Sequence, residues 1–426
     1  MPATPSRGLP DAVCLRVLMF GWEFPPFQAG GLGTATQGLV KGLVRQGAQV
    51  TLVVPFEAGA SDLTALRLVS AARSMGAVTV HRIATPMTAY GGADAYLTTL
   101  EQARLGGVPT AVYGRNLQEE VERFAAVAGA IAEREAHDVI DTHDWLTFGA
   151  GLRARAASGK PLVAHIHATE FDRSGEAVDQ GIARRERHGL ASANRVIANS
   201  RRLRELVVTR YQIAPDRVDV VHWGIDGARA APGRPGGSPF PAGDPVVLFI
   251  GRITRQKGPE TFVQVARRVA DHVPNARFLM AGVGDLLPAV IERSVALGLA
   301  DRMHFAGPLA GADVDRAYRL ADVCVMPSVS EPFGLVALES LRNGTPCIIP
   351  RTAGASETIR NAFKVDFWDV EEMANQVIGL LRHPALRDEL NRRGLEELGQ
   401  PRFGLDEPAR LTIDSYRRAL AGAGAR

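Results

Sequence analysis

Cysteine and lysine are both scarce in this chain of 426 residues. The three cysteines, Cys14, Cys324 and Cys347, lie far apart, each within or beside an apolar run. This spacing argues against a disulfide framework and against a zinc motif, and it predicts buried free thiols. Of the 49 basic residues, only four are lysines. A lysine in a ligand-binding loop is therefore more informative here than in a protein of average composition.

Long apolar runs and a strong charge bias are also missing. No stretch is long and apolar enough to span a membrane, and the polar, proline-rich residues 1–12 lack the apolar core of a signal peptide. We expect residues 1–12 to form a flexible tail. The net charge of +3 gives no basic surface of the kind that binds nucleic acid. The sequence thus predicts a cytoplasmic protein with neither stable membrane insertion nor a nucleic-acid partner, and it leaves the oligomeric state open.

The length predicts two domains, because 426 residues exceed one ordinary hydrophobic core. Apolar strand-like runs alternate with helical stretches, which is typical of an α/β fold with two doubly wound, Rossmann-like domains. We expect the first domain to cover residues 13–225 and the second to cover residues 245–404. The proline- and glycine-rich residues 226–244 are expected to form the linker. Because ligands of such sheets bind outside the carboxyl ends of the strands, we expect the site in a cleft between the domains.

The strands of both domains are expected at short, nearly continuous apolar runs. Such runs predict strands that are buried on both faces of a parallel sheet. Residues 56–115 give no clear pattern. The expected strands of the first domain are 13–20, 49–55, 138–141, 162–166, 195–198 and 218–221, and those of the second are 246–250, 277–281, 304–306, 323–326 and 347–349.

The most informative stretch runs from residue 327 to residue 357. Glu331 is expected in a loop after a buried strand, and Glu339 follows on a short helix that begins around Gly334. The N-terminus of this helix exposes unpaired N–H groups and the positive end of the helix dipole, which suit a phosphate. Gly334, which lacks a Cβ, lets an anion or a sugar approach the backbone. Contacts to such a ligand are expected from Phe333, Gly334, Leu335 and Glu339.

The context of the two glutamates distinguishes them from a chance pair on a solvated helix. An apolar strand precedes them, and a second strand and the turn 352–354 follow. The stretch resembles the Glu-x7-Glu signature of retaining GT-B glycosyltransferases, close to glycosyltransferase family 4, and the resemblance extends over nearly the whole chain. It implies a GT-B fold in which a terminal helix, residues 405–422, crosses back to the first domain.

The loop after the first strand of the second domain carries Arg252 and Lys257. A solvated turn is the ordinary interpretation of such residues, but lysine is rare in this chain. A compact ammonium group suits a diphosphate oxygen as a point charge, and a guanidinium group binds phosphate as a fork. The two residues resemble the Arg/Lys diphosphate clamp of the family. The loops at Gly282 and at Pro308 and Leu309 follow the next strands of the same edge and are expected to hold the base and ribose.

A glycine-rich turn, at Gly31 and Gly33, precedes the first helix of the first domain. The turn is compatible with phosphate binding, and a dinucleotide-binding motif is the alternative interpretation. The loop before the turn is too long for that motif, and no acidic residue clearly closes the second strand. The loop instead resembles the acceptor- and phosphate-side loop of glycogen synthase-like enzymes. These relatives often carry a lysine where this chain has Gln28.

Histidines and aspartates follow two strands of the first domain. His143, His165 and His167, with Asp141 and Asp144, could in principle bind a metal, but no compact ligand motif supports such a site. We expect His143 and His165 to be polar residues at strand ends. His167 and Asp144 match positions that face the donor sugar and the acceptor in glycogen synthase-like relatives.

The resemblance implies a retaining hexosyltransferase that moves a hexose, with glucose preferred, from a nucleotide diphosphate sugar to a carbohydrate acceptor. Arg252 and Lys257 would offset the charge that builds on the departing diphosphate. Glu331 would bind the donor sugar and stabilise its cation-like transition state, and Glu339 would hold the ribose hydroxyls. His167 and Asp144 would position the sugar from the opposite wall. The donor is expected to be ADP- or UDP-glucose, with no cofactor and no metal.

The first domain indicates a glycogen or α-glucan acceptor, because residues 22–33, 143–145 and 167–170 resemble glycogen synthase-like enzymes more than lipid-glycosylating ones. A sugar phosphate, a lipid or another polysaccharide remains an alternative acceptor. A sugar-nucleotide epimerase shares the fold and remains an alternative activity. The scarcity of lysine argues against a phosphorylase that carries pyridoxal phosphate. A binding protein without catalysis is disfavoured by the presence of Arg252, Lys257, Glu331 and Glu339.

Overall fold

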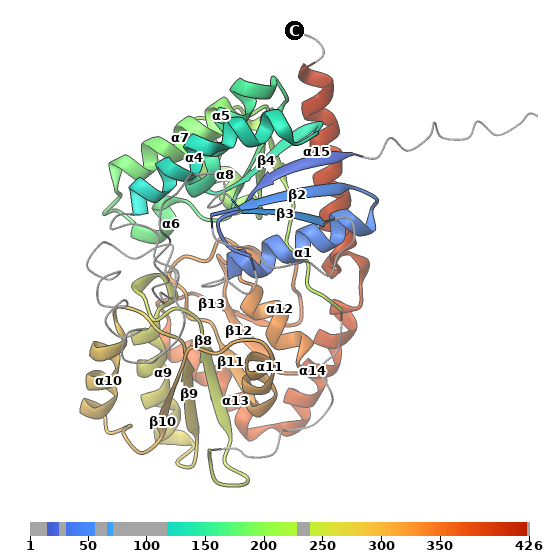
Figure 1. Cartoon of the computed structure of the whole chain (residues 1–426). Helices are drawn as coiled ribbons and strands as arrows, with labels where there is room; N and C mark the ends of the chain where they lie inside the picture. Colours follow the sequence, from blue (N-terminus) through green and yellow to red (C-terminus); the bar gives the residue numbers. More distant parts are fainter. Residues whose placement is uncertain (1–14, 25–30, 56–65, 71–116, 228–238, 424–426) are drawn as a thin grey trace, which may run out of the picture.

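The computed structural model describes residues 15–24, 31–55, 66–70, 117–227 and 239–423. Within them, the two halves of the chain each form a parallel sheet covered by helices on both faces, and Figure 1 shows one half above the other. The predicted α/β fold with two doubly wound domains is confirmed. The predicted tail 1–12, Cys14, Gln28 and part of the predicted linker lie outside the described residues.

The first sheet has seven strands in the order β3-β2-β1-β4-β5-β6-β7, and every pairing is parallel. Successive side chains of a strand point to opposite faces of the sheet, so the apolar runs supply two cores. Leu18 and Phe20 of β1 belong to one core, and Val17 and Met19 belong to the other. The strands are β1 (Arg16–Phe20), β2 (Gln49–Val54), β3 (Leu66–Ser70), β4 (Val139–His143), β5 (Leu162–Ile166), β6 (Arg195–Ala198) and β7 (Val218–Val220).

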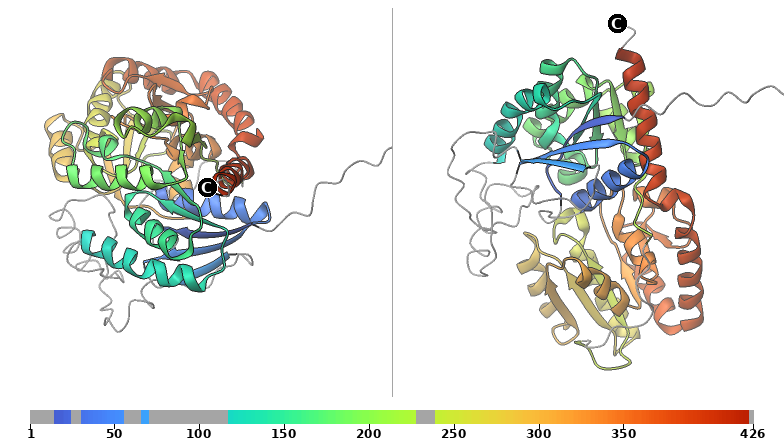
Figure 2. Two further views of the ribbon diagram at one scale, coloured as in Figure 1. Left: turned by 90° about the horizontal axis from the view of Figure 1, so that it is seen from above. Right: turned by 45° about the vertical axis from the view of Figure 1, so that its right-hand side comes forward.

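Helices from both ends of the chain cover the first sheet. Helices α4, α5, α7 and α8 pack on the Leu18 face, whereas α1 and the terminal helix α15 (Asp406–Ala423) pack on the Val17 face. Figures 1 and 2 show α15 running alongside this sheet. The other helices of this half are α1 (Gly31–Arg45), α4 (Leu117–Arg134), α5 (Trp145–Ser158), α6 (Glu170–Ser174), α7 (Gln180–Ser192) and α8 (Arg201–Arg210), with a 3-10 turn at Pro215–Arg217.

The second sheet has six parallel strands in the order β10-β9-β8-β11-β12-β13. Its strands are β8 (Val246–Ile250), β9 (Arg277–Ala281), β10 (Met303–Gly307), β11 (Val323–Val325), β12 (Cys347–Pro350) and β13 (Phe363–Val365). Its helices are α9 (Pro259–His272), α10 (Leu287–Ala296), α11 (Ala312–Leu320), α12 (Leu335–Arg342), α13 (Val370–Arg382) and α14 (Pro384–Leu398), with 3-10 turns at Arg255–Lys257, Gly354–Glu357 and Pro401–Phe403.

The bounds of the expected strands agree with the observed ones to within three residues, and the structure adds two strands, β3 and β13, that the sequence pattern did not indicate. Cys324 and Cys347 are buried free thiols on the paired strands β11 and β12, as expected. Burial raises the pKa of the Cys324 thiol to about 12. No helix in the described part of the chain has both the length and the apolarity needed to cross a bilayer.

Candidate functional site

The residues predicted to bind the donor lie at the carboxyl edges of the two sheets, where these edges approach each other. Trp223, which follows β7, lies with its ring centroid 5.4 Å from that of Phe333, which precedes α12. His167, after β5, packs against the other side of Trp223, with the two ring centroids 5.2 Å apart and the rings tilted by 42°. A row of three rings therefore connects the first-domain site residue to the start of α12.

Lys257 and Glu331 form an ion pair at this edge, although 74 residues separate them in sequence. The Nζ of Lys257 lies 2.7 Å from Oε2 of Glu331, and the Oγ of Ser328 donates a second hydrogen bond to the same oxygen, at 3.0 Å. Glu331 is 5% exposed. An ammonium held this firmly costs little further ordering when a ligand binds, which is the condition for effective electrostatic catalysis.

Gly258 is the reason that Lys257 reaches the loop of Glu331. It adopts the left-handed conformation, with φ of 67°, and a Cβ at this position would lie 2.1 Å from the carbonyl oxygen of Pro327. A residue with a side chain would separate the two loops. A backbone hydrogen bond also joins the two loops: the N–H of Val329 donates to the carbonyl of Gln256 at 2.9 Å.

The N-terminus of α12 begins at Leu335, with Gly334 as its N-cap at φ of 103°. The first turn carries no acidic residue, and no side chain caps it. A Cβ on Gly334 would lie 3.0 Å from Cγ of Glu331, so glycine lets this carboxylate lie beside the helix start. The helix dipole therefore adds positive potential next to Lys257.

The N-terminus of α1 meets that of α12. A Cβ on Gly31, the first residue of α1, would lie 3.9 Å from Cδ1 of Leu335. The amide of Gly33 donates to Oε2 of the buried Glu23 at 3.3 Å. Two positive helix ends thus converge, and one of them already has a carboxylate from its own domain.

Glu339 lies on α12 and is partly buried. Its Oε2 accepts a hydrogen bond from the hydroxyl of Tyr318, on α11, at 2.9 Å. Burial raises the pKa of Glu339 above its ordinary value, although Tyr318 and Arg342 act in the opposite direction. A carboxylate held by one hydroxyl group is chemically suited to hold others, such as those of a ribose.

The remaining predicted residues of the second domain lie along the same edge. Arg252 follows β8 and donates from Nη2 to Oε1 of Gln256 at 3.0 Å. Gly282 follows β9, and its amide donates to the carbonyl of Gly307. Pro308 and Leu309 follow β10, the outermost strand on that side, so three strand positions separate them from the strand that precedes Glu331.

Asp144 and His167 are brought together, but Asp144 is fully buried. Its Oδ1 accepts a hydrogen bond from the backbone N–H of His167 at 2.7 Å. Asp144 precedes α5 with φ of 61°, an unfavourable conformation for a non-glycine residue that costs on the order of 1–3 kcal/mol. The described geometry therefore has Asp144 fixing the backbone of His167.

Three histidines gather beside these residues, in the only such cluster among the described histidine, cysteine and acidic side chains. One ring nitrogen from each of His143, His165 and His167 lies within 4.8 Å of the others. The rings are stacked, with an interplanar angle of 11° between His143 and each of its neighbours. A zinc ion lies in the plane of each imidazole that binds it, at about 2.0–2.1 Å from the nitrogen. Stacked planes do not meet at one point, so this arrangement does not suit a shared metal ion.

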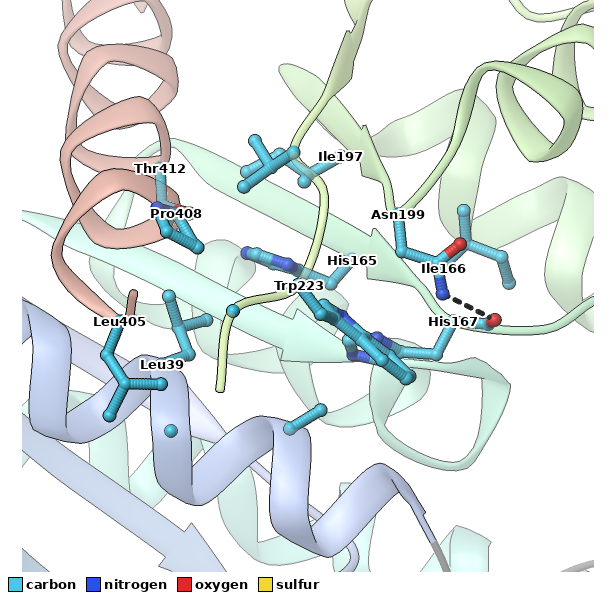
Figure 3. Close-up of a pocket in the computed structure, with 14 residues that line it drawn as sticks. Leu39, His165, Ile166, His167, Ile197, Asn199, Trp223, Leu405, Pro408 and Thr412 are labelled. Carbon is cyan, nitrogen blue, oxygen red and sulfur yellow. Dashed lines mark hydrogen bonds between the residues drawn. The ribbon is translucent and has the colours of Figure 1, made fainter. Parts of the chain in front are cut away.

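A cavity of about 20 Å³ lies next to this cluster, and Figure 3 shows its lining. His165 and His167 line it from the sheet, and Asn199, Trp223 and Thr412 surround them. This volume matches about one water molecule or one hydroxyl group. The cavity is therefore a place for a single polar atom beside the two imidazoles.

Contacts between the domains include residues that the sequence pattern did not single out. Glu357, after β12, accepts hydrogen bonds from the backbone N–H groups of Arg201 and Arg202, at 2.9 and 3.0 Å, and lies 2.8 Å from Nε2 of His222. Burial opposes ionisation of Glu357, but these hydrogen bonds outweigh it, so its pKa is lowered. We call Glu357, the first two residues of α8 and His222 the interdomain latch.

Arg202 adds a second connection between the domains. Its Nη1 donates to Asp172 of α6, and its Nη2 donates to Oγ of Ser330, both at 2.9 Å. Ser330 precedes Glu331, so the first domain directly fixes the loop that carries the pair. His222 and Trp223 follow a strand, and the rule that ligands bind at carboxyl ends would have singled them out; Glu357 and Arg202 gave no comparable signal.

Two doubly wound domains with their carboxyl edges opposed define the GT-B class of architecture. The family model described as "Glycosyltransferase Family 4" matches residues 29–229, and the one described as "Glycosyl transferases group 1" matches residues 235–397. A D-inositol 3-phosphate glycosyltransferase of Acidothermus cellulolyticus is 33% identical over 70% of this chain and 71% of its own length. The chain belongs to glycosyltransferase family 4.

Other relatives cover more of the chain. An uncharacterised glycosyltransferase of Methanocaldococcus jannaschii is 26% identical over 96% of this chain and its own full length. The structure of sucrose-phosphate synthase from Thermosynechococcus elongatus matches with a TM-score of 0.74 at 22% identity, over 96% of this chain and all of the other. Anabaena HepE, whose structure contains UDP and glucose, matches with a TM-score of 0.67 at 17% identity, over 94% and 98%. These likenesses establish the shared fold.

Proposed function

We propose that this glycosyltransferase moves a hexose, with glucose preferred, from ADP- or UDP-glucose to a carbohydrate acceptor, with retention of the anomeric configuration. The observation that carries the proposal is the ion pair of Lys257 and Glu331 beside the uncapped N-terminus of α12. It offers a cation, a helix dipole and a carboxylate within one small volume. A nucleotide diphosphate sugar has an anionic diphosphate and a hydroxyl-rich hexose in the same arrangement.

The cationic part of the site would act on the leaving group. As the glycosidic bond breaks, negative charge builds on the diphosphate, and groups already aimed at it stabilise the transition state most. Lys257 and Arg252 would supply this charge together with the N-terminus of α12. Side chains would then do what a divalent cation does in other transferases.

The carboxylates would act on the two sugars of the donor. Glu331 uses Oε2 for Lys257 and Ser328, so we assign Oε1 to a hydroxyl of the hexose. Its negative charge also favours the cation-like transition state. Glu339 would exchange its bond with Tyr318 for the ribose hydroxyls, and His167 would position the hexose from the first domain.

An α-glucan acceptor, as in glycogen synthesis, is the first candidate. Its support lies in the first domain, where the turn at Gly31 and Gly33, residues 143–145 and residues 167–170 resemble glycogen synthase-like enzymes. The structure gathers His143, Asp144 and His167 next to the contact with the second domain, where an acceptor would have to approach the hexose.

A sugar phosphate is the second candidate acceptor. Several relatives at 31–33% identity are named D-inositol 3-phosphate glycosyltransferases, and a fold relative is named sucrose-phosphate synthase. Family membership does not decide the acceptor, because substrate choice depends on the site and not on the fold. The two candidates differ in one requirement: a sugar phosphate needs a second anion site beside the donor.

A screen with both donors and several acceptors tests the proposal. Purified protein is incubated with ADP-glucose or UDP-glucose as the donor. The acceptor is maltooligosaccharide, inositol 3-phosphate, fructose 6-phosphate or a lipid. The release of the nucleoside diphosphate, ADP or UDP, is measured. The anomeric configuration of the product is read by NMR, and Glu331→Gln is the inactive control. Transfer to maltooligosaccharide supports the glucan acceptor, and transfer only to a phosphorylated sugar supports the second candidate. Product of inverted configuration would overturn the retaining mechanism.

A further inference from the structure

A continuous row of polar side chains connects the terminal helix to His167 through the interior of the first domain. The hydroxyl of Tyr416, on α15, donates to Oδ2 of Asp141 at 2.5 Å. Nε2 of His143 lies 3.4 Å from the same oxygen, and Nδ1 of His143 lies 2.8 Å from Nε2 of His167. The members Tyr416, Asp141 and His143 are completely buried, and His167 is 6% exposed.

The carboxylate at the centre of this row is ionised. Burial alone would raise the pKa of Asp141, but the adjacent His165 and His143 outweigh burial, and the pKa lies well below its ordinary value. His165 contributes its Nε2 at 3.3 Å from Oδ1. A buried carboxylate has only acceptor oxygens, so it favours a proton on each group that faces it: the hydroxyl of Tyr416, Nε2 of His143 and Nε2 of His165.

A proton on Nε2 of His143 decides the rest of the row. When His143 carries a single ring proton and that proton is on Nε2, its Nδ1 is an acceptor. The short contact to His167 therefore requires a proton on Nε2 of His167. Burial lowers the pKa of His167 well below its ordinary value, and the neighbouring His143 and His165 lower it further, so His167 is neutral. Its Nδ1 is left as an acceptor.

The Nδ1 of His167 is buried and has no hydrogen-bond partner among the described residues. Nε2 of His143 and Nε2 of His165 also lack a hydrogen bond, but they lie 3.4 and 3.3 Å from the oxygens of Asp141. His167 lines the cavity of about 20 Å³, which is large enough for a single hydroxyl group (Figure 3). A neutral ring of the opposite tautomer would present an N–H group from the same position.

We propose that Tyr416 and Asp141 are positioning residues which act through His143 to hold His167 as the Nε2–H tautomer, with Nδ1 as a hydrogen-bond acceptor for a hydroxyl of the substrate. The role of Nδ1 as an acceptor for a substrate hydroxyl rests on the proposed transferase function, whereas the tautomer of His167 does not. Outer partners of this kind fix the ring orientation and tautomer of functional histidines in other proteins as well. The terminal helix is thereby part of the site, although it lies at the far end of the sequence.

The ring nitrogens of the histidines, read by long-range 15N–1H NMR at neutral pH, test the tautomer without any activity. The wild type is expected to show His167 protonated on Nε2 alone, with the signal assigned through His167→Ala. In Asp141→Asn the amide offers one acceptor oxygen to three donors, so His143 and His167 should become tautomer mixtures. Unchanged His167 nitrogens in Asp141→Asn would overturn the proposal, and so would a wild-type ring protonated on Nδ1.

Two single-atom deletions on α15 separate positioning from packing. Tyr416→Phe removes the hydroxyl that orients Asp141. Ser415→Ala, the matched control, removes an adjacent buried hydroxyl that donates to Asp219 at 2.7 Å and is not in the row. Both variants should loosen α15 to a similar extent in thermal unfolding. Only Tyr416→Phe should alter the nitrogen signals of His143 or His167, and equal signals in both variants would overturn the role of Tyr416.

Kinetics with the donor and acceptor found by the screen complete the test. We expect kcat/KM to fall about tenfold in Asp141→Asn, as for other lost outer partners of histidine, and about fivefold in Tyr416→Phe, with little change in Ser415→Ala. Altered tautomers with unaltered kinetics would overturn the link to substrate. Altered tautomers in a protein without transferase activity would refute the proposed function and leave the tautomer assignment standing. Zinc that binds and shifts all three histidines would overturn the proposal in favour of a metal site.

Discussion

The two sheet edges that meet at the site use polar residues in opposite ways. On the second domain, Lys257 and Arg252 remain partly exposed, and the ion pair of Lys257 and Glu331 stands beside a helix N-terminus. On the first domain, Asp141 and His143 are completely buried, and burial keeps His167 neutral. The same architecture thus supplies partly exposed charge on one side and buried, fixed donors and acceptors on the other. A ligand that is anionic at one end and hydroxylated at the other matches this division.

The largest expected effect comes from removing charge on the second domain. Lys257→Ala should lower kcat/KM. The decrease should correspond to a loss of roughly 2–4 kcal/mol of transition-state stabilisation, as is typical for one preorganised group in a closed site. Lys160→Ala is the matched control, because Lys160 is exposed just before β5. Steady-state kinetics with the sugar nucleotide that the screen identifies as donor would measure kcat/KM for both variants. Full turnover in Lys257→Ala would remove this residue from the site and undo the contrast between the edges.

Replacing Gly258 tests the backbone contact that brings the Lys257 loop against the Glu331 loop, without changing the charge of either residue. Gly258→Ala combines the left-handed conformation with a contact of 2.1 Å to Pro327, so it should reduce the free energy of unfolding by about 2–3 kcal/mol. Gly159→Ala has nearly the same φ, at 68°, and no atom within 4 Å, so it should cost about 1 kcal/mol. Denaturant unfolding compares the two. Equal losses would show that the close approach to Pro327 does not constrain the loop.

The interdomain latch predicts an effect of pH on the association of the edges. The pKa of Glu357 in the folded protein is lowered from 4.5, so its stabilisation is present above that pH and is lost as the pH falls through the lowered value. Glu357→Gln should therefore reduce the free energy of unfolding by about 1–2 kcal/mol at neutral pH and by little once the pH lies below the lowered pKa of Glu357. Glu205→Gln, at an exposed position on α8, is the control. A difference between wild type and Glu357→Gln that is independent of pH would contradict the latch.

The smallest expected effect is that of a chelator. Asp313 and Asp315 lie in the first turn of α11, and Asp315 is bound to Arg342 and Asn343, at 2.5 and 2.9 Å. The carboxylate of Asp315 is thus used within the domain, and we expect Lys257 and Arg252 to offset the charge of the diphosphate. Transfer should continue at an unchanged rate in EDTA. Loss of activity in EDTA and its return with magnesium would show that the charged edge is incomplete without a cation.

Patterns that are local in sequence predicted the fold and the charged edge well. Buried parallel strands such as β5 and β8 are short apolar runs, and their expected bounds agree with the structure. The short helix that was predicted to begin around Gly334 begins at Leu335, with Gly334 as its N-cap. By contrast, β13 has three residues with Lys364 at its centre, which gives too little apolar pattern to indicate a strand.

Contacts between distant positions were not predictable in the same way. The sequence indicated Lys257 and Glu331 as separate binding residues, and only the fold shows that they form a pair. Asp141 and Tyr416 are 275 residues apart, and neither has a neighbouring motif that indicates the other. Asp144 was predicted to contact the sugar, whereas its bond to the His167 backbone depends on a φ of 61° that composition does not reveal.

The interdomain latch has a consequence for how the two halves find each other. Glu357 occupies the N-terminus of α8 as an anion from the other domain, in the place where a free carboxylate could bind only weakly. Because one chain carries both partners, they meet at an effective concentration set by the connecting segments, on the order of millimolar for short flexible linkers. A contact too weak to join two separate proteins can then keep the domains associated, yet release them within a catalytic cycle. This carboxylate contact would act together with the bond between Arg202 and Ser330, which joins the same two domains.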